Sequence, residues 1–226
     1  MRITILTVGT WGDIVPLMAL GLGLQKAGHQ VQLATHGFFN SQIVSRGLAH
    51  YPMAGNPQEI NRSEFGQVLL GSGENPLTFI RQYGQIAQQL LQQLLADSWE
   101  ACQGTEAIVV VPFTFWGYDI AEKLGVPFYL AALLPLHACR DFPIPTMPAM
   151  GGWPWESLYN QLSYPLIRLS FWQLLRGPIN QWRQSTLNLP PLSPCQEPLT
   201  RMERVPFLYA YSRAIVPRPI GRHNCT

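Results

Sequence analysis

Charged residues are scarce in this sequence, and no segment concentrates one sign of charge. Only 12% of the 226 residues are charged, and 15 Lys and Arg against 13 Asp and Glu give a formal net charge of +2. Domains that bind nucleic acid carry clustered positive charge on one face. No run of basic residues occurs here, so we expect no nucleic-acid partner.

Cysteine and long apolar runs are scarce too. The four cysteines are widely spaced, without a C-x-x-C pair, which argues against a zinc site or a disulfide framework. Met1 leads directly into a strand-like segment, without the features of a signal peptide, and no window holds about 18 uninterrupted apolar residues. We therefore expect a cytoplasmic protein with reduced thiols that is neither secreted nor membrane-spanning.

What the sequence does contain is a regular alternation of short apolar runs and helical patterns. Apolar residues make up 47% of the chain, enough for a substantial core. The alternation predicts an α/β fold, a Rossmann-like open parallel sheet with helices on both faces. Strands are expected at residues 2–8, 30–36, 48–54, 106–113 and 126–133, and helices at 16–29, 37–47, 77–102 and 116–125.

The segment after residue 134 has a different character. Residues 135–155 are rich in Pro, Gly and Trp, as in an ordered loop that lines a site or a plain surface loop. Residues 157–189 are helical in pattern, with aromatic, leucine and arginine side chains and no acid. Two interpretations are open: this helix lies on a membrane surface, or it packs on the sheet.

The first turn, "TVGTWGDIVP", places one carboxylate, Asp13, between a strand and a helix. The turn is not G-x-G-x-x-G and no acid follows the second strand, which disfavours a dinucleotide redox cofactor. Asp13 is a good residue for the N-terminus of a helix. The first turn of such folds is also where their chemistry is found, so a capping role and a catalytic role are both open.

The opening "MRITILTVGTWGDIVPLMALGLGLQKAGHQVQLATHGFF" resembles the N-terminal domain of the sterol glucosyltransferase-like glycosyltransferases of family 28. The shared pattern is T-x-G-[ST]-x-G-D-[VI]-x-P, followed by A-L-x-x-x-L-x-x-x-G-H-x-V. Later stretches, including "IAEKLGVPFYLAALLPLHACRDFPIP" and "PFLYAYSRAIVPRP", are similar in the same order. The likeness therefore covers about residues 1–219, which we take as one domain.

The resemblance implies the N-terminal half of an inverting glycosyltransferase of the two-domain GT-B architecture. In this family the N-terminal half holds the acceptor and the C-terminal half holds a nucleotide-sugar, here expected to be UDP-glucose. The expected acceptor is a hydroxyl of a sterol or another lipid-like molecule, and no metal is expected. Asp13 then corresponds to the general base that takes the proton of that hydroxyl.

The resemblance also gives roles to neighbouring residues. Gly9, Thr10 and Gly12 let the backbone approach the sugar, and the Thr10 hydroxyl bonds a donor or acceptor oxygen; alternatively, they only form the turn. His36, at the end of the second strand, lines the acceptor cleft or is a structural histidine.

Five aromatic residues are candidates for an apolar wall of the acceptor cleft. Three follow the fourth strand, and two lie in the loop before the last helix; packing in the core is the competing interpretation. They are Phe113, Phe115, Trp116, Trp153 and Trp155.

The last residues, 220–226, read "IGRHNCT" and do not resemble the linker that joins the two halves in the family. The expectation is that the donor-binding half comes from another chain. The alternative is an inactive remnant or a non-catalytic module that binds the acceptor. The basic, aromatic helix adds the expectation of peripheral membrane contact.

Overall fold

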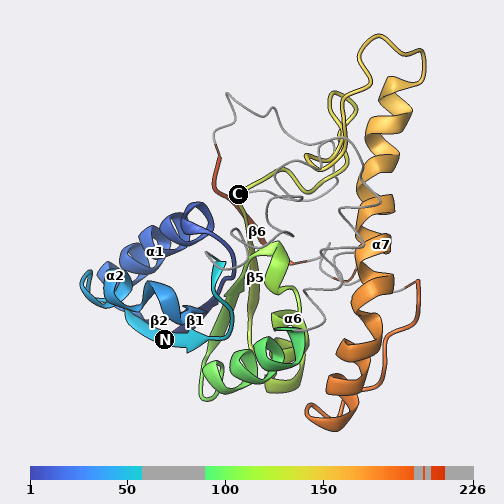
Figure 1. The fold of residues 1–226 in the computed structure, drawn as a ribbon. Helices are drawn as coiled ribbons and strands as arrows, with labels where there is room; N and C mark the ends of the chain where they lie inside the picture. Colours follow the sequence, from blue (N-terminus) through green and yellow to red (C-terminus); the bar gives the residue numbers. More distant parts are fainter. Residues whose placement is uncertain (58–89, 196–200, 202–204, 212–226) are drawn as a thin grey trace.

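Figure 1 shows the fold in a computed structural model, which describes residues 1–57, 90–195, 201 and 205–211. Its centre is one six-stranded sheet in the order β3-β2-β1-β4-β5-β6, and all neighbouring strands are parallel. The predicted α/β, Rossmann-like class is thereby confirmed. The strands are β1 (Arg2–Leu6), β2 (Gln30–His36), β3 (Ala49–Met53), β4 (Ala107–Val110), β5 (Phe128–Ala132) and β6 (Phe207–Tyr209).

Helices cover both faces of the sheet, which explains why β4 is apolar and buried along its whole length. Ile5 and Ile14 belong to the core cluster on one face, and Leu6 and Trp172 belong to the core cluster on the other. The first face carries α1 (Trp11–Lys26), η1 (Gly37–Phe39) and α2 (Asn40–Val44). The second carries a helical stretch at residues 90–101, α6 (Gly117–Leu124) and α7 (Glu156–Ser185), with η2 (Pro112–Thr114) before α6.

Helix α1 begins at Trp11, earlier than the predicted start at Pro16. The first turn is closed ahead of the proline, because the Ile14 N–H donates to the Thr10 carbonyl over 3.2 Å. The Asp13 carboxylate also accepts the Thr10 N–H. A capping carboxylate three residues into a helix satisfies an N–H that has no partner within the helix.

The predicted helix at 157–189 is confirmed as α7. Trp172, Leu175 and Ile179 in its second half are buried in the core, so this half packs on the sheet side of the molecule. No helix among the described residues is long and apolar enough to cross a membrane.

One strand was missed by the prediction, and one predicted helix lies partly outside the described residues. Strand β6 was not predicted; it has only three residues and pairs with β5 alone, too short for a period-two pattern to stand out. The predicted helix at 77–102 begins outside the described residues, and within them residues 90–101 are helical.

Candidate functional site

The strand order reverses between β1 and β4, where the chain crosses from one side of the sheet to the other. The segment after β1 leads to α1 on one face, and the segment after β4 leads to α6 on the other. In open α/β sheets this switch point, at the carboxyl ends of the strands, is where ligands bind. Asp13 comes from the segment that follows β1.

The Asp13 carboxylate is half-buried and is fixed through one oxygen. Its Oδ2 accepts the Thr10 N–H at 2.8 Å and the Thr10 hydroxyl at 3.1 Å. Both bonds cap the first turn of α1, so the capping interpretation describes the resting geometry. Within the described residues no bond to Oδ1 is found. That oxygen is therefore available to a further donor, and capping does not exclude a proton-accepting role.

Gly9 is required by the position of this carboxylate. Its φ is +131°, a backbone conformation that residues other than glycine rarely adopt. A Cβ at this position would lie 2.4 Å from Asp13 Oδ2. Gly12 is under no such constraint, because its nearest neighbour, Thr10 Oγ1, would be 3.8 Å from an added Cβ. Of the two predicted turn glycines, only Gly9 lies against Asp13.

His36, at the end of β2, is buried and is hydrogen-bonded to the backbone of the turn. Its Nε2 accepts the Gly9 N–H at 3.3 Å, and its Nδ1 lies 2.7 Å from the Ala54 carbonyl. Nδ1 therefore carries the proton and donates to Ala54, and the ring is neutral. Burial lowers the pKa of His36, although the hydrogen bond to Ala54 acts in the opposite direction. This geometry is that of a structural histidine behind the site.

Asp97 extends this network and was not singled out from the sequence. Its Oδ2 accepts the Ala54 N–H at 2.7 Å, so the loop after β3 is held at Ala54 by both His36 and Asp97. The result is a connected path from the helical stretch at 90–101, through the ends of β3 and β2, to the backbone of Gly9. Nothing local in the sequence marks Asp97, because its partner is far away along the chain.

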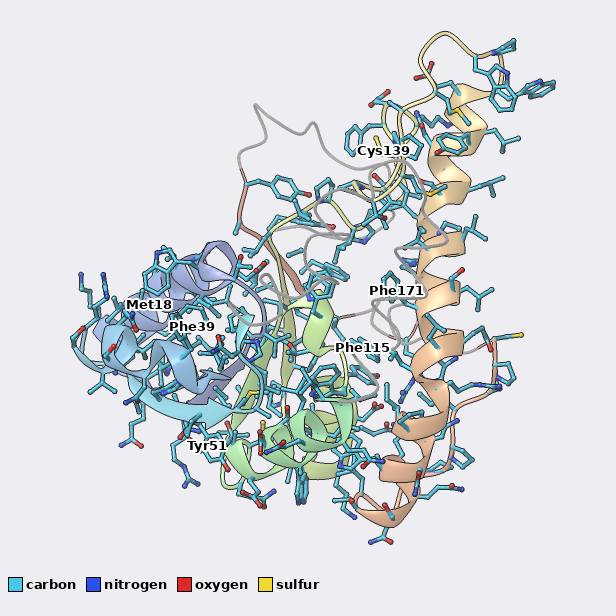
Figure 2. All side chains as sticks on the ribbon, viewed as in Figure 1. Met18, Phe39, Tyr51, Phe115, Cys139 and Phe171 are labelled. Carbon is cyan, nitrogen blue, oxygen red and sulfur yellow. The ribbon has the colours of Figure 1, made fainter. Side chains whose placement is uncertain are left out.

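The segment after β4 is fixed to β1 as well. The buried Thr114 hydroxyl donates to the Leu6 carbonyl over 2.9 Å. Phe113 is 46% exposed, whereas Phe115 is half-buried on the α7 side of the sheet (Figure 2). Trp116 is buried in the core, and its indole N–H donates to Ser98.

The five aromatic candidates do not come together. Trp153 and Trp155 are exposed and directly precede α7, whose first turns project beyond the sheet (Figure 1). They do not lie with Phe113 and Phe115 at the end of β4. Their expected grouping into one wall fails because the loop carries them outward along α7, and Trp116 belongs to the core.

An aromatic residue beside the site has no counterpart among the sequence candidates. Trp11 is the first residue of α1, is 41% exposed, and packs on Phe39 with ring centroids 5.6 Å apart. The Arg46 guanidinium lies over the Trp11 ring at 6.0 Å. The Trp11 ring is therefore held against η1 by Phe39 and is covered on one face by the Arg46 cation.

A partly buried ion-pair cluster also went unnoticed in the sequence, with Arg183 and Asp119 buried and Glu122 exposed. Arg183 of α7 pairs with Asp119 and Glu122 of α6, and Arg201 reaches the same two carboxylates at 2.9 and 2.7 Å. These carboxylates join α7 to α6 and are committed to that role. A signal was present: α7 carries arginines without an acid beyond its first residue, so a partner had to lie elsewhere in the chain. Among the described residues no group of three His, Cys, Asp or Glu side chains is arranged to hold a metal ion.

Comparison with known proteins agrees with this geometry. Residues 3–142 match the glycosyltransferase family 28 N-terminal domain. The chain is 35% identical over 225 residues to a sterol 3-beta-glucosyltransferase of Yarrowia lipolytica, covering 97% of this chain and 14% of that protein. It is 34% identical to the UDP-sugar-dependent glycosyltransferase 52 of Dictyostelium discoideum, covering 97% of this chain and 13% of that protein. The chain thus spans about one-seventh of the length of these relatives.

Solved structures with the same fold are glycosyltransferases. The glycotransferase of kitacinnamycin has a TM-score of 0.61 at 12% identity, covering 97% of this chain and 48% of that one. SsfS6 of Streptomyces sp. SF2575 has a TM-score of 0.53 at 16% identity, covering 85% of this chain and 48% of that one. At such identities the likeness concerns the fold alone. With a family match over most of its length and with this sheet, the chain belongs to glycosyltransferase family 28, in which it corresponds to the N-terminal domain.

Proposed function

We propose that this chain is the acceptor-side half of an inverting glycosyltransferase that transfers a hexosyl group to a hydroxyl of a sterol or another lipid-like molecule. Asp13 is the general base. Its carboxylate takes the proton of the acceptor hydroxyl while the hydroxyl oxygen bonds to the anomeric carbon and the bond from that carbon to the diphosphate breaks. An alcohol attacks well only when its proton has an acceptor in place.

The observation that carries the proposal is the geometry of Asp13 at the switch point of the sheet. The carboxylate is half-buried, it is oriented by two hydrogen bonds to Oδ2, and Oδ1 remains available. A base needs this combination of fixed position and access to substrate. Gly9 permits the close approach of backbone and carboxylate, and His36 holds Gly9.

Support for a lipid-like acceptor comes from the relatives and from exposed aromatic side chains on the segments that follow β1 and β4. Several relatives are sterol 3-beta-glucosyltransferases. Trp11 and Phe113 expose aromatic area on the two segments that meet at the switch point. A flat, apolar acceptor is recognised by such side chains, with few polar contacts to orient it.

The donor in this proposal is UDP-glucose or a similar nucleotide-sugar, held by a second domain and without a metal. The name of the Dictyostelium relative specifies a UDP-sugar, and the chain covers about half of each solved glycosyltransferase. Helix N-termini and backbone amides of that second domain would stabilise the departing diphosphate. The proposal places the reaction on the cytoplasmic side of a membrane.

The experiment that tests the proposal measures glucosyl transfer from labelled UDP-glucose to a pool of sterols and lipids. The chain is assayed alone and with the donor-binding segment of the Yarrowia relative, the part that follows the matched region, added as a separate chain. Both mixtures are run with wild type and with Asp13→Asn. We expect transfer only with both halves, and a loss of about a hundredfold or more for Asp13→Asn, the range of general-base contributions. Binding of a fluorescent sterol, measured separately, is expected to survive this substitution.

Glu106→Gln is the matched control, because Glu106 also accepts a backbone N–H, that of Arg2 at the other end of β1. It makes the same chemical change without touching the site, and transfer is expected to stay within threefold of wild type. Equal loss in both variants would remove the special role of Asp13. Sterol binding without transfer in any mixture would identify a non-catalytic acceptor-binding module.

A further inference from the structure

The first half of α7 has one face that contacts the preceding loop and another that points outward. Tyr159, Asn160 and Ser163 point to the preceding loop and bond its backbone at Pro148, Arg140 and Ile144, over 2.8 to 2.9 Å. These bonds order the Pro-rich loop along one side of the helix. In Figure 2 side chains on the other side of α7 point away from the rest of the described chain.

That outward side carries a row of leucines, which we call the leucine stripe. Their spacing of four, four and three residues keeps them on one face of the helix. Each is at least 42% exposed. The members are Leu158, Leu162, Leu166 and Leu169. Four exposed leucines in one line form a continuous apolar ridge, unlike the scattered single apolar residues of an ordinary surface.

Tryptophans stand at the start of the leucine stripe. Trp153 and Trp155 are 53% and 64% exposed and directly precede α7. Tryptophan is enriched where an apolar phase meets water, since its ring is largely apolar and its N–H is polar. The stripe lies in the first half of α7, and the N-terminal end of this helix projects beyond the sheet (Figure 1).

The charge on α7 beyond its first residue has one sign. Arg176 follows Leu169 by seven residues and therefore lies on the same face. The acid of α7, Glu156, accepts the Gly152 N–H at the start of the helix, and no Asp or Glu follows it in the helix. An apolar ridge followed by an arginine, on a helix without a carboxylate after its first residue, complements a layer of acyl chains beneath anionic headgroups.

We propose that the leucine stripe, with Trp153 and Trp155, is the surface by which this chain docks on an anionic lipid bilayer. The helix lies flat, with the leucines in the acyl-chain boundary and Arg176 at the phosphates. The choice of a bilayer rests in part on the proposed function, because a sterol or lipid acceptor resides in one. The leucines make none of the hydrogen bonds that hold the Pro-rich loop, which come from Tyr159, Asn160 and Ser163, so docking leaves those bonds in place.

The experiment is flotation of the 226-residue chain with sterol-free vesicles of phosphatidylcholine and phosphatidylserine. Quenching of tryptophan fluorescence by brominated acyl chains is measured in parallel. We expect wild type to float and to be quenched. Leu162→Gln with Leu166→Gln is expected to weaken binding by about tenfold or more, since two apolar contacts become polar. Arg176→Gln is expected to weaken binding to anionic vesicles by about fivefold and to leave binding to neutral ones unchanged.

Val44→Gln is the matched control, because Val44 is 53% exposed, close to the 55% of Leu162, and lies on α2 at the other end of the sheet. It is expected to float like wild type. Circular dichroism establishes that all variants are folded. A wild type that does not float, or a double variant that binds within twofold of wild type, would overturn the docking surface. So would a double variant that changes only the oligomeric state, which would identify a second copy as the occupant.

These vesicles contain no sterol and the assay contains no nucleotide-sugar, so the two proposals fail separately. Loss of flotation with intact binding of a soluble sterol would overturn the docking surface alone. Intact flotation with no sterol binding and no transfer would overturn the proposed function alone.

Discussion

The turn after β1 and the long helix α7 place their side chains by opposite means. In the turn, the hydrogen bonds are local: Asp13 accepts from Thr10, and Gly9 leaves room for the carboxylate, all within five consecutive residues. One distant residue, His36, accepts the Gly9 N–H. In α7, a regular helix runs from Glu156 to Ser185, yet its second half is buried in the core and its first half exposes leucines.

The difference shows what local geometry fixes and what it leaves open. A tight turn is determined by the conformations its residues allow, so its conformation can be read from a few letters of sequence. A helix of leucines and aromatics forms with either face covered, and which face meets the core depends on elements far away in the chain. Four substitutions test this contrast.

The largest loss in the free energy of unfolding is expected in the second half of α7, at Arg183. Replacing Arg183 by Met leaves Asp119 buried with only Arg201 as its partner, and removing one member of a buried pair costs about 3 to 5 kcal/mol. Urea denaturation measures the loss. Arg176→Met on the same helix is the control and is expected to change the free energy of unfolding by less than about 1 kcal/mol. A small effect at Arg183 would mean that α7 is held by its apolar contacts alone.

The next effect is expected in the turn. Gly9→Ala forces a left-handed conformation on alanine and sets its Cβ against the Asp13 carboxylate, at a cost of about 2 to 3 kcal/mol. Gly12→Ala, which has room for its Cβ inside the helix, is expected to be neutral or stabilising by about 0.5 to 1 kcal/mol. Thermal unfolding of the two variants compares them directly. Similar values would show that the turn relaxes without strain.

A smaller loss of folding stability is expected when the pH is lowered. Burial lowers the pKa of His36 from its ordinary 6.5, so the unfolded chain takes up a proton before the folded one does. Stability is therefore complete above pH 6.5 and is lost progressively as the pH falls below it. Urea midpoints at several pH values measure this slope. His36→Gln is expected to flatten it, and His36→Gln with His50→Gln to flatten it further, since burial also lowers the pKa of His50. A slope of the opposite sign would rule out a neutral, buried His36.

The smallest effect is expected on the leucine stripe. Leu169→Gln replaces a side chain that is 42% exposed, and we expect the free energy of unfolding to change by less than about 0.5 kcal/mol. Differential scanning calorimetry measures it. A loss above about 2 kcal/mol, typical of a buried leucine, would show that the stripe is covered within the folded chain.

Prediction from sequence succeeded where a pattern is local and repeated. The five strands and the helix over 157–189 follow from short apolar runs and helical spacing, and all are present. Strand β6 was missed because three residues carry no detectable period, and the early start of α1 was missed because Pro16 suggested the boundary. For the candidate site, the sequence placed Gly9 and Asp13 in one turn, as the structure has them, and the catalytic role of Asp13 stays a prediction. The aromatic residues that the sequence grouped are separated in the structure.

The sequence by itself determined the fold class, the family resemblance and the turn that presents Asp13, since each depends on residues close together in the chain. Only the tertiary structure decided that His36 supports Gly9 from behind, that Arg183 is neutralised by Asp119, and that the leucine stripe is exposed. The physical reason is that burial and pairing depend on contacts between elements. Residues 64 positions apart, like Asp119 and Arg183, leave no periodic trace in the sequence.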